Sequence, residues 1–340
     1  MNTKPLPRLR RPGTVALALG AALTLVTGLT ACSTDAGAPA EAAAADGTAV
    51  TTIRVQTPPF AFEGVEIGIR NGIFAKHGLK VVSDYAGGDP TSQIAKVVSG
   101  QLDLAMSGGP DAIRAVAKGI PIMITGGAQH SSADGEPTDG ILVAPDSPIK
   151  DWKDLTGATI GISGLGSLPQ IVTDIALEKN GVDFSTVKYV NLPNDALEGA
   201  AAKGQIDAAL PTSVFYTKAV ADGFRALGRG TKEFFPGAPQ IVWVASKAFV
   251  QKNATALKAF NEAMAEANAY ANQHPDLIRQ IDHEKTKLPA AFIDNRPIEK
   301  MDNTVDRNVY ATLTGAMNKF GFVEKNVSVD DVVWKDAPQP

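Results

Sequence analysis

The sequence is poor in cysteine and in aromatic residues, and it carries little net charge. Only one of its 340 residues is a cysteine, Cys32, which excludes a disulfide framework, a Cys-x-x-Cys redox centre and a zinc or iron–sulfur site built from several cysteines. Aromatic residues make up 6% of the chain, so no aromatic stacking platform is indicated. The formal net charge is −4, whereas binding to a phosphate backbone needs a basic face, so we expect no nucleic-acid partner.

Motifs for catalysis and metal binding are also missing from the sequence. The four histidines, His77, His130, His274 and His283, show neither His-x-x-x-His nor His-Glu-x-x-His spacing. There is no Gly-x-Ser-x-Gly nucleophile elbow, and the glycine-rich stretch 161–167 lacks the Gly-Lys-Ser/Thr ending of a phosphate-binding loop. We therefore expect no catalytic residue, no metal and no cofactor, and a protein that is not an enzyme.

The first 31 residues have the pattern of an export signal. Basic residues precede Pro12, and residues 12–33 are uncharged and rich in Ala and Leu. A stretch of this length also permits a transmembrane helix, but Gly and Thr dilute it and it ends in Leu29-Thr30-Ala31-Cys32. That ending resembles the bacterial lipobox, which implies cleavage before Cys32 and acylation of this residue. A free cysteine in an ordinary signal is the alternative, and Arg10-Arg11 leaves Sec or twin-arginine export open.

Cleavage of residues 1–31 would leave a tether and a more acidic body. The leader holds four basic residues and no acidic ones, so its removal changes the net charge from −4 to −8. Residues 32–50 are small and polar without periodicity, and we expect a flexible tether there. Acyl chains on Cys32 would anchor the protein to the extracytoplasmic face of the cell membrane.

Strands and helices alternate at short spacing after residue 51, which is typical of α/β folds. Strands are expected at 53–57, 79–85, 102–106, 120–126, 141–144, 158–162, 187–190, 206–210 and 241–246, and helices at 63–74, 91–99, 111–118, 169–180, 196–202 and 254–272. The pattern restarts after Gly140, and segments near positions 140 and 240 suit two crossings between lobes. We therefore predict a first lobe of residues 51–140 plus 241–330 and a second lobe of residues 141–240.

A short repeat supports two similar lobes. Gly100-Gln-Leu-Asp103 and Gly204-Gln-Ile-Asp207 each follow an expected helix and open an expected strand. We expect Asp103 and Asp207 to form hydrogen bonds at these strand entries rather than to take part in catalysis.

Four strand-to-helix junctions, at 57–60, 107–109, 163–167 and 211–213, carry small and hydroxyl residues. Ligands of open α/β sheets bind outside the carboxyl ends of the strands, so these loops form the candidate site, although ordinary turns and caps use the same residues. Glycines in 163–167 would let N–H groups approach an oxyanion at a helix start. The candidate ligand contacts are Thr57, Phe60, Phe62, Ser107, Gly108, Gly109, His130, Ser163, Gly164, Gly166, Ser167, Thr212, Ser213 and Trp243. No Lys or Arg lies in the four loops, which favours an organic molecule over a bare inorganic anion.

Four motifs follow one another along the chain between about residues 53 and 325. They are Gly72-Ile-Phe-Ala-Lys-His-Gly-Leu79, Gly100-Gln-Leu-Asp103, Asp154-Leu-Thr-Gly157 with Thr159-Ile-Gly161, and Gly204-Gln-Ile-Asp207. They resemble elements of ABC-transporter solute-binding proteins of the nitrate/sulfonate/taurine and thiamine-precursor group. The resemblance implies a bilobed periplasmic-binding-protein fold with two crossover segments, and cleft closure on a small solute. It also implies an ABC permease with its cytoplasmic ATPase as partner, and loops 107–108 and 164–167 around an anionic group of the ligand.

The sequence thus predicts a lipid-anchored, monomeric solute receptor for a small organic anion or heterocycle, such as a sulfonate, a taurine-like molecule, an aromatic carboxylate or a pyrimidine, with nitrate also open. An exported ligand sensor is one alternative, which the sequence does not separate from a transport receptor. An enzyme that resembles pyrimidine synthases is the other. Those enzymes use a cysteine-rich motif, which a single Cys32 does not supply.

Overall fold

The computed structural model describes residues 42–43, 49–57, 61–85, 90–130, 136–236, 239–287, 289–296 and 298–340. The predicted leader 1–31, Cys32, Phe60 and most of the predicted tether lie outside these ranges. The described residues all belong to one compact unit, Glu41–Pro340. Among them, no helix has both the length and the apolar composition that crossing a membrane requires.

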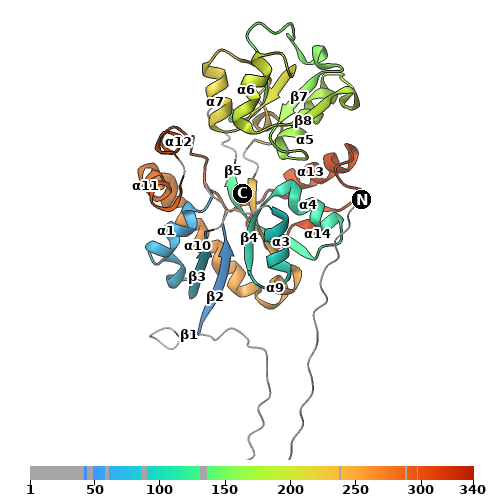
Figure 1. Ribbon diagram of the computed structural model, residues 1–340. Helices are drawn as coiled ribbons and strands as arrows, with labels where there is room; N and C mark the ends of the chain where they lie inside the picture. Colours follow the sequence, from blue (N-terminus) through green and yellow to red (C-terminus); the bar gives the residue numbers. More distant parts are fainter. Residues whose placement is uncertain are drawn as a thin grey trace, which may run out of the picture. The chain divides into compact units, whose positions relative to one another are not determined.

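The first sheet has six strands, ordered β1-β2-β4-β11-β5, with β3 also paired to β2 (Figure 1). Its strands are β1 (Ala42–Ala43), β2 (Ala49–Gln56), β3 (Leu79–Asp84), β4 (Leu104–Gly108), β5 (Ile122–His130) and β11 (Pro239–Ser246). Strand β2 is parallel to β3 and β4, whereas β11 runs antiparallel between β4 and β5. Because β11 comes late in the sequence, the chain leaves this sheet after β5 and later returns to it.

The second sheet has five strands, ordered β10-β6-β9-β7-β8. They are β6 (Ile141–Val143), β7 (Thr159–Ile162), β8 (Lys188–Asn191), β9 (Ala208–Leu210) and β10 (Arg225–Leu227). Strand β7 is parallel to β8 and β9, and β6 is antiparallel to β9 and β10. Two sheets interleaved with helices confirm the predicted α/β class.

Helices connect the strands of both sheets, and more helices follow β11. Those in the stretches of chain before β6 and after β10 are α1 (Glu63–Arg70), α2 (Ile73–Lys76), α3 (Pro90–Val98), α4 (Gly109–Ala117), α8 (Thr231–Phe234), α9 (Lys247–Lys252), α10 (Ala254–Gln273), α11 (Pro275–Lys285), α12 (Ala290–Asn295), α13 (Arg307–Lys319) and α14 (Val329–Val332). Between β6 and β10 lie α5 (Leu168–Lys179), α6 (Asn194–Ala202), α7 (Val214–Ala221) and the 3-10 turns η1 (Trp152–Leu155) and η2 (Phe184–Thr186). The single helix predicted at 63–74 is wrong: Gly72 takes a φ of +64°, which separates α1 from α2.

Helix α10 and the start of α5 place the candidate site. Leu257, Phe260 and Met264 of α10 are buried in the core of the first sheet, as their spacing predicts. Leu168 and Ile171 of α5 also pack in this core, although α5 directly follows β7 of the second sheet. The loop between β7 and α5 therefore lies beside elements of the first sheet.

The two copies of the repeat make the same contacts at the entries of β4 and β9. Asp103 N–H donates to the Arg54 carbonyl oxygen over 2.9 Å, and Asp207 N–H donates to the Thr159 carbonyl oxygen over 2.8 Å. In return, Asp103 Oδ2 accepts from Arg54 N–H and Asp207 Oδ2 accepts from Thr159 N–H, each over 2.7 Å. Both aspartates thus tie a strand entry to the neighbouring parallel strand.

Candidate ligand-binding site

A pocket of about 430 Å³ is lined by elements of both sheets, and most of its lining residues are polar or glycine. Its lining residues are Gly108, Pro110, Asp111, Gln129, Thr138, Asp139, Ser163, Gly164, Ser167, Leu168, Pro169, Thr212, Ser213, Thr231, Gln240, Ile241, Phe292, Arg296 and Glu299. A volume of this size suits a small metabolite, because ligand pockets commonly hold about 300–1,000 Å³.

The loop 163–167 between β7 and α5 forms part of the wall and is stabilised from within. Gly166 has a φ of +74°, which favours glycine. Its N–H donates to Gln170 Oε1 over 2.6 Å. Ser167 N–H donates to the Gly164 carbonyl oxygen over 3.3 Å. The N–H groups of Gly166 and Ser167, which the sequence predicts to meet an oxyanion, therefore already donate hydrogen bonds within the protein.

Arg114 of α4 links this loop to the first sheet. Its Nη1 donates to the Gly166 carbonyl oxygen over 2.7 Å, and its Nη2 pairs with Asp111. A Cβ on Gly166 would lie 2.7 Å from Arg114 Nη1, so a side chain there would displace the guanidinium. Because Asp111 lines the pocket, this contact joins two sides of the pocket.

The loop 211–213 after β9 brings two hydroxyl residues to the same wall. Asn194 Nδ2 donates to Thr212 Oγ1 over 2.8 Å, and Asn194 Oδ1 accepts from Thr212 N–H over 3.3 Å. Ser213 has a φ of +57°, and it is the one non-glycine residue with positive φ in the described part of the chain. Such backbone costs of the order of 1–3 kcal/mol and is concentrated at functional sites, which favours Ser213 as a ligand contact.

Asp139 is a buried acid on this side of the pocket. Its Oδ1 accepts from Thr231 N–H over 2.9 Å, and its Oδ2 accepts from the Thr231 hydroxyl. Burial raises the pKa of Asp139, and the hydrogen bonds from Thr231 only partly offset this. The wall from the second sheet and its neighbouring loops thus offers a carboxyl group and several hydroxyls.

The opposite wall includes a segment, residues 289–296 with 298–299, that the sequence pattern did not mark. Phe292, Arg296 and Glu299 of this segment line the pocket. The Phe292 ring lies 6.2 Å from the ring of Phe215 on α7, centroid to centroid, at an interplanar angle of 47°. An aromatic pair therefore connects α12 with α7 at the pocket.

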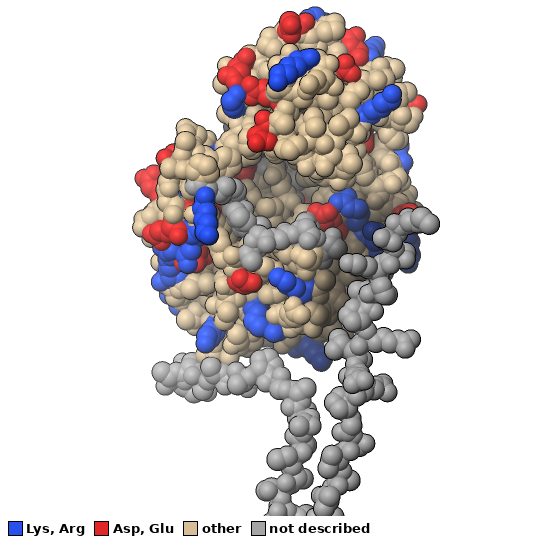
Figure 2. All heavy atoms as spheres, in the orientation of Figure 1, with Lys and Arg blue, Asp and Glu red and all other residues tan. Residues whose placement is uncertain are grey.

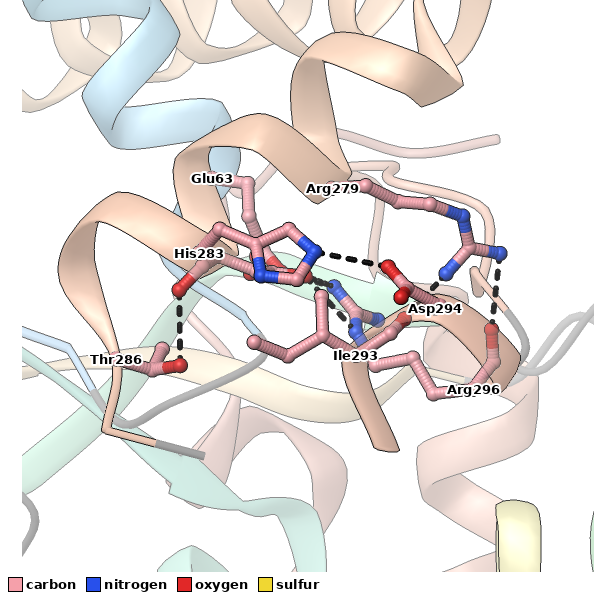
Figure 3. Close-up of polar contacts among 8 residues, drawn as sticks. Glu63, Arg279, His283, Thr286, Ile293, Asp294 and Arg296 are labelled. Carbon is pink, nitrogen blue, oxygen red and sulfur yellow. Dashed lines mark hydrogen bonds and ion pairs between the residues drawn. The ribbon is translucent and has the colours of Figure 1, made fainter. Parts of the chain in front are cut away.

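Helix α11 holds this segment in place (Figure 3). Arg279 donates to the carbonyl oxygens of Ile293 and Arg296. His283 Nε2 lies 2.8 Å from Asp294 Oδ1. Contacts from two successive turns of α11 thus fix the position from which Arg296 contributes to the pocket wall.

Arg296 is buried against two carboxyl groups. Its Nη2 lies 2.5 Å from Glu63 Oε1 on α1 and 2.5 Å from Asp282 Oδ2 on α11, and its Nε donates to the same Asp282 oxygen over 3.0 Å. The side chains of Glu63 and Asp282 are 0% exposed, and that of Arg296 is 5% exposed. Burial raises the pKa of Glu63 to about 8, although Arg296 lowers it, and Asp282 adds to the rise. The charge of Arg296 is therefore matched inside the protein before a ligand binds.

The pocket as a whole does not concentrate positive charge. Its lining holds three acidic residues, Asp111, Asp139 and Glu299, and one basic residue, Arg296. Over the described residues of one face of the molecule, Lys and Arg side chains are interspersed with Asp and Glu (Figure 2). Among the lining residues, an anion would therefore meet no cation that lacks a carboxylate partner.

Six of the predicted contacts line this pocket: Gly108, Ser163, Gly164, Ser167, Thr212 and Ser213. Gly166 lies in the same loop and contacts Arg114. Thr57, Ser107, Gly109 and His130 are buried and are not among the lining residues. Phe60 and the predicted lipidation site Cys32 lie outside the described residues.

Two predicted aromatic contacts are packed in the interior. Trp243 on β11 is 0% exposed and lies edge-on to Phe260, with ring centroids 5.3 Å apart. Phe62 is 1% exposed and lies edge-on to Tyr85, with centroids 4.1 Å apart. Neither lines the pocket, because apolar burial against neighbouring rings already accounts for these side chains.

The pocket also contains residues that the sequence did not mark. Gln129 and Gln240 lie near the ends of β5 and β11. Phe292 lies in α12, and Arg296 and Glu299 follow this helix. One signal was present: Gln129 directly precedes His130, which was predicted to line the cleft. For Arg296 no local signal exists, because its partner Glu63 is 233 positions away.

Comparisons with known proteins agree with the predicted resemblance. A formylaminopyrimidine-binding protein from Halalkalibacterium halodurans is 25% identical over 242 residues, which cover 68% of this chain and 70% of that protein. The periplasmic aliphatic sulphonate-binding protein SsuA from Escherichia coli superposes with a TM-score of 0.66 at 22% identity, covering 85% of this chain and 93% of that one. The periplasmic nitrate-binding protein NrtA from Synechocystis PCC 6803 gives a TM-score of 0.60 at 16% identity, covering 85% of this chain and 87% of that one.

These likenesses confirm the predicted fold, that of the periplasmic binding proteins. The two structural matches are too low in sequence identity to show more than the fold. The family model described as "NMT1/THI5 like" matches residues 60–278, which is more than half of the chain. The chain therefore belongs to the NMT1/THI5-like family.

Proposed function

We propose that this protein is the solute-binding protein of an ABC importer, and that it captures a small polar heterocycle without a strong negative charge. Its family, its fold and relatives named for the binding of formylaminopyrimidine, sulphonate and nitrate support the role of a binding protein rather than an enzyme. The pocket volume of about 430 Å³ supports a small ligand.

The observation that carries the choice of ligand is the charge balance of the pocket. Three acids and one base line it, and that base already pairs with two buried carboxyl groups. Hydroxyl and amide side chains both donate and accept hydrogen bonds, whereas carboxylates only accept, so the wall suits ring N–H, amino and carbonyl groups. A sulfonate or nitrate would meet acceptors without an unpaired cation. The curated relative that binds formylaminopyrimidine agrees with this preference.

We propose that binding closes the two predicted lobes, 51–140 with 241–330 and 141–240, around the ligand. Ser163, Ser167 and Thr212 would contact it from loops that follow strands of the second sheet, and Gln129 and Gln240 from strands of the first sheet. Hinge closure around a ligand between two domains is a common device of such receptors. The closed form would deliver the ligand to a permease with a cytoplasmic ATPase.

We also propose that Cys32 carries the lipid anchor and that the receptor is a monomer on the extracytoplasmic face of the membrane. The support is the lipobox-like end of an export signal at Leu29–Cys32. Under this proposal, Cys32→Ala moves the protein from the membrane fraction to the soluble one. A C32A variant that stays with the membrane would contradict it.

Calorimetry and thermal shift with three probes test the ligand class. The probes are a formylaminopyrimidine, ethanesulfonate and nitrate, each with the mature protein at pH 7. A ligand at 100 times its Kd should add roughly 2.7 kcal/mol to the free energy of unfolding. We expect stabilisation by the pyrimidine and none by the two anions.

A matched pair of variants shows whether binding uses the pocket. Ser163→Ala with Ser167→Ala removes two lining hydroxyls, whereas Ser185→Ala removes an exposed hydroxyl on η2. We expect weaker pyrimidine binding in the first protein only. Saturable binding of ethanesulfonate without any response to the pyrimidine would contradict the proposed ligand class.

A further inference from the structure

Glu63, Asp282 and Arg296 form a buried cluster in which two carboxyl oxygens lack a hydrogen-bond donor, and Figure 3 labels Glu63 and Arg296 of this cluster. Glu63 Oε2 and Asp282 Oδ1 are buried, and neither has a hydrogen-bond partner. The hydroxyl of Tyr85, also buried, likewise has none. Two ionised carboxylates offer only acceptors, so both free oxygens would lack a donor, which is costly in a dry interior.

One proton on the two carboxyl groups resolves this shortage. A protonated carboxyl supplies an O–H donor, and it also changes the total charge of the cluster from −1 to zero. Like charges held close together in the interior are not both ionised, and burial disfavours the charged form further. The pKa of Glu63, raised to about 8 by its burial, agrees with this geometry.

The other charged and titratable groups around the cluster do not replace this proton. Tyr85 faces it from the end of β3, and its buried hydroxyl stays protonated because burial and the nearby carboxyl groups raise its pKa. Glu66, one turn along α1 from Glu63, pairs with Arg70 at 2.7 Å and with Lys285 at 3.1 Å. The surface charges are therefore balanced separately from the buried ones.

We propose that Glu63 and Asp282 share one proton and together cancel the charge of Arg296, and that this makes the pocket reject anions. Glu63 and Asp282 do not line the pocket, but their partner Arg296 does. They would thus determine specificity without touching the ligand. The inference rests on the proposed function, because it explains how the pocket favours a ligand without a strong negative charge.

Under this proposal, either carboxyl group alone can balance the charge of Arg296 at neutral pH. If one is replaced by its amide, the other loses its acidic neighbour, ionises beside Arg296 and keeps the cluster neutral. If both are replaced, Arg296 loses the two buried carboxyl groups that it pairs with, and the total charge of the cluster rises to +1. The double variant should therefore accept an anion that the single variants reject.

The binding experiment compares wild type, Glu63→Gln, Asp282→Asn and E63Q/D282N by calorimetry at pH 7, with ethanesulfonate and a formylaminopyrimidine as probes. We expect ethanesulfonate to bind at least tenfold more tightly to the double variant than to either single variant. Asp174→Asn is the matched control, because Asp174 is a buried carboxyl group on α5 outside the pocket. A folded double variant without this gain, beside a wild type that binds the pyrimidine and not ethanesulfonate, would overturn this proposal alone. A wild type that binds ethanesulfonate would overturn the proposed ligand class and, with it, the rejection of anions.

A ligand-free measurement keeps the proposal testable if the double variant does not fold. Glu63 has a raised pKa in the folded state, so its protonated form is favoured by folding, and stability is lost as pH rises from its ordinary value of 4.5 to about 8. The amide introduced by E63Q cannot ionise, so the Tm of wild type should fall relative to that of E63Q between pH 5 and pH 9. D282N should lose most of this dependence as well. D174N should retain it above pH 7, because burial raises the pKa of Asp174 to about 6 and its own contribution lies below that pH. If the Tm values of wild type and E63Q changed in parallel with pH, the proposal of a shared proton would be overturned.

Discussion

The two sides of the pocket are built from different kinds of structure. On one side, Ser163, Ser167 and Thr212 lie in short loops that follow the strands of the second sheet. On the other, Arg296 and Glu299 follow a helix and reach the pocket from a segment that α11 holds in place. The first side presents small hydroxyls, and the second presents long charged side chains.

The difference lies in how each side satisfies its polar groups. Gly166 N–H finds its acceptor on Gln170, four residues away in the sequence. Arg296 finds Asp282 at a separation of 14 residues and Glu63 at a separation of 233. The loop 163–167 is thus stabilised in part by a local hydrogen bond, whereas Arg296 depends on buried ion pairs that exist only in the folded protein. Substitutions on the charged side should therefore cost more stability.

Among the variants that test this comparison, Arg296→Met should lower the free energy of unfolding most. The substitution removes the cation between Glu63 and Asp282, and breaking a buried pair costs about 3–5 kcal/mol. We expect a loss of that order in the free energy of unfolding at pH 8, measured by urea denaturation. The loss should shrink as pH falls toward 5, because the pKa of Glu63 is raised to about 8 by burial and its protonation removes part of the uncompensated charge.

The control for this prediction lies on the hydroxyl side. Ser163→Ala removes an exposed hydroxyl from the pocket wall, and surface substitutions of this kind usually stay within about 0.5 kcal/mol. Equal losses in R296M and S163A would show that the two sides do not differ in the way described.

The same difference explains how much of the molecule was predictable. Features that depend on residues close together in the sequence could be predicted. The aspartates at the strand entries, Asp103 and Asp207, make the expected hydrogen bonds, and the α10 residues with helical spacing are buried. The hydroxyl loops after β7 and β9, which line the pocket, could be singled out because topology alone places the ends of parallel strands at one edge of a sheet.

The charged side was not predictable, because nothing near Arg296 in the sequence marks it. Its role depends on Glu63, which the helical pattern placed in an ordinary first turn, and on Asp282 in a different helix. Trp243 shows the opposite failure. Its place on a segment that crosses between the lobes suggested exposure to the cleft, but the strand that carries it is central in the first sheet and buries it completely.

A smaller effect is expected at Gly166, where the hydroxyl side contacts Arg114 of α4. Gly166→Ala forces a residue with a side chain to a φ of +74° and brings its Cβ to 2.7 Å from Arg114 Nη1. Gly181→Ala is the matched control, since Gly181 has a φ of +76° and no atom within 4 Å of an added Cβ. Both variants should lose roughly 1 kcal/mol of stability from the left-handed backbone.

Only G166A should also lose the hydrogen bond from Arg114, and we expect it to bind the pyrimidine several-fold more weakly than G181A does. If calorimetry gave equal affinities of G166A and G181A for the pyrimidine, the hydrogen bond from Arg114 to the loop would not affect ligand binding. The loop and α4 would then contribute independently to the pocket.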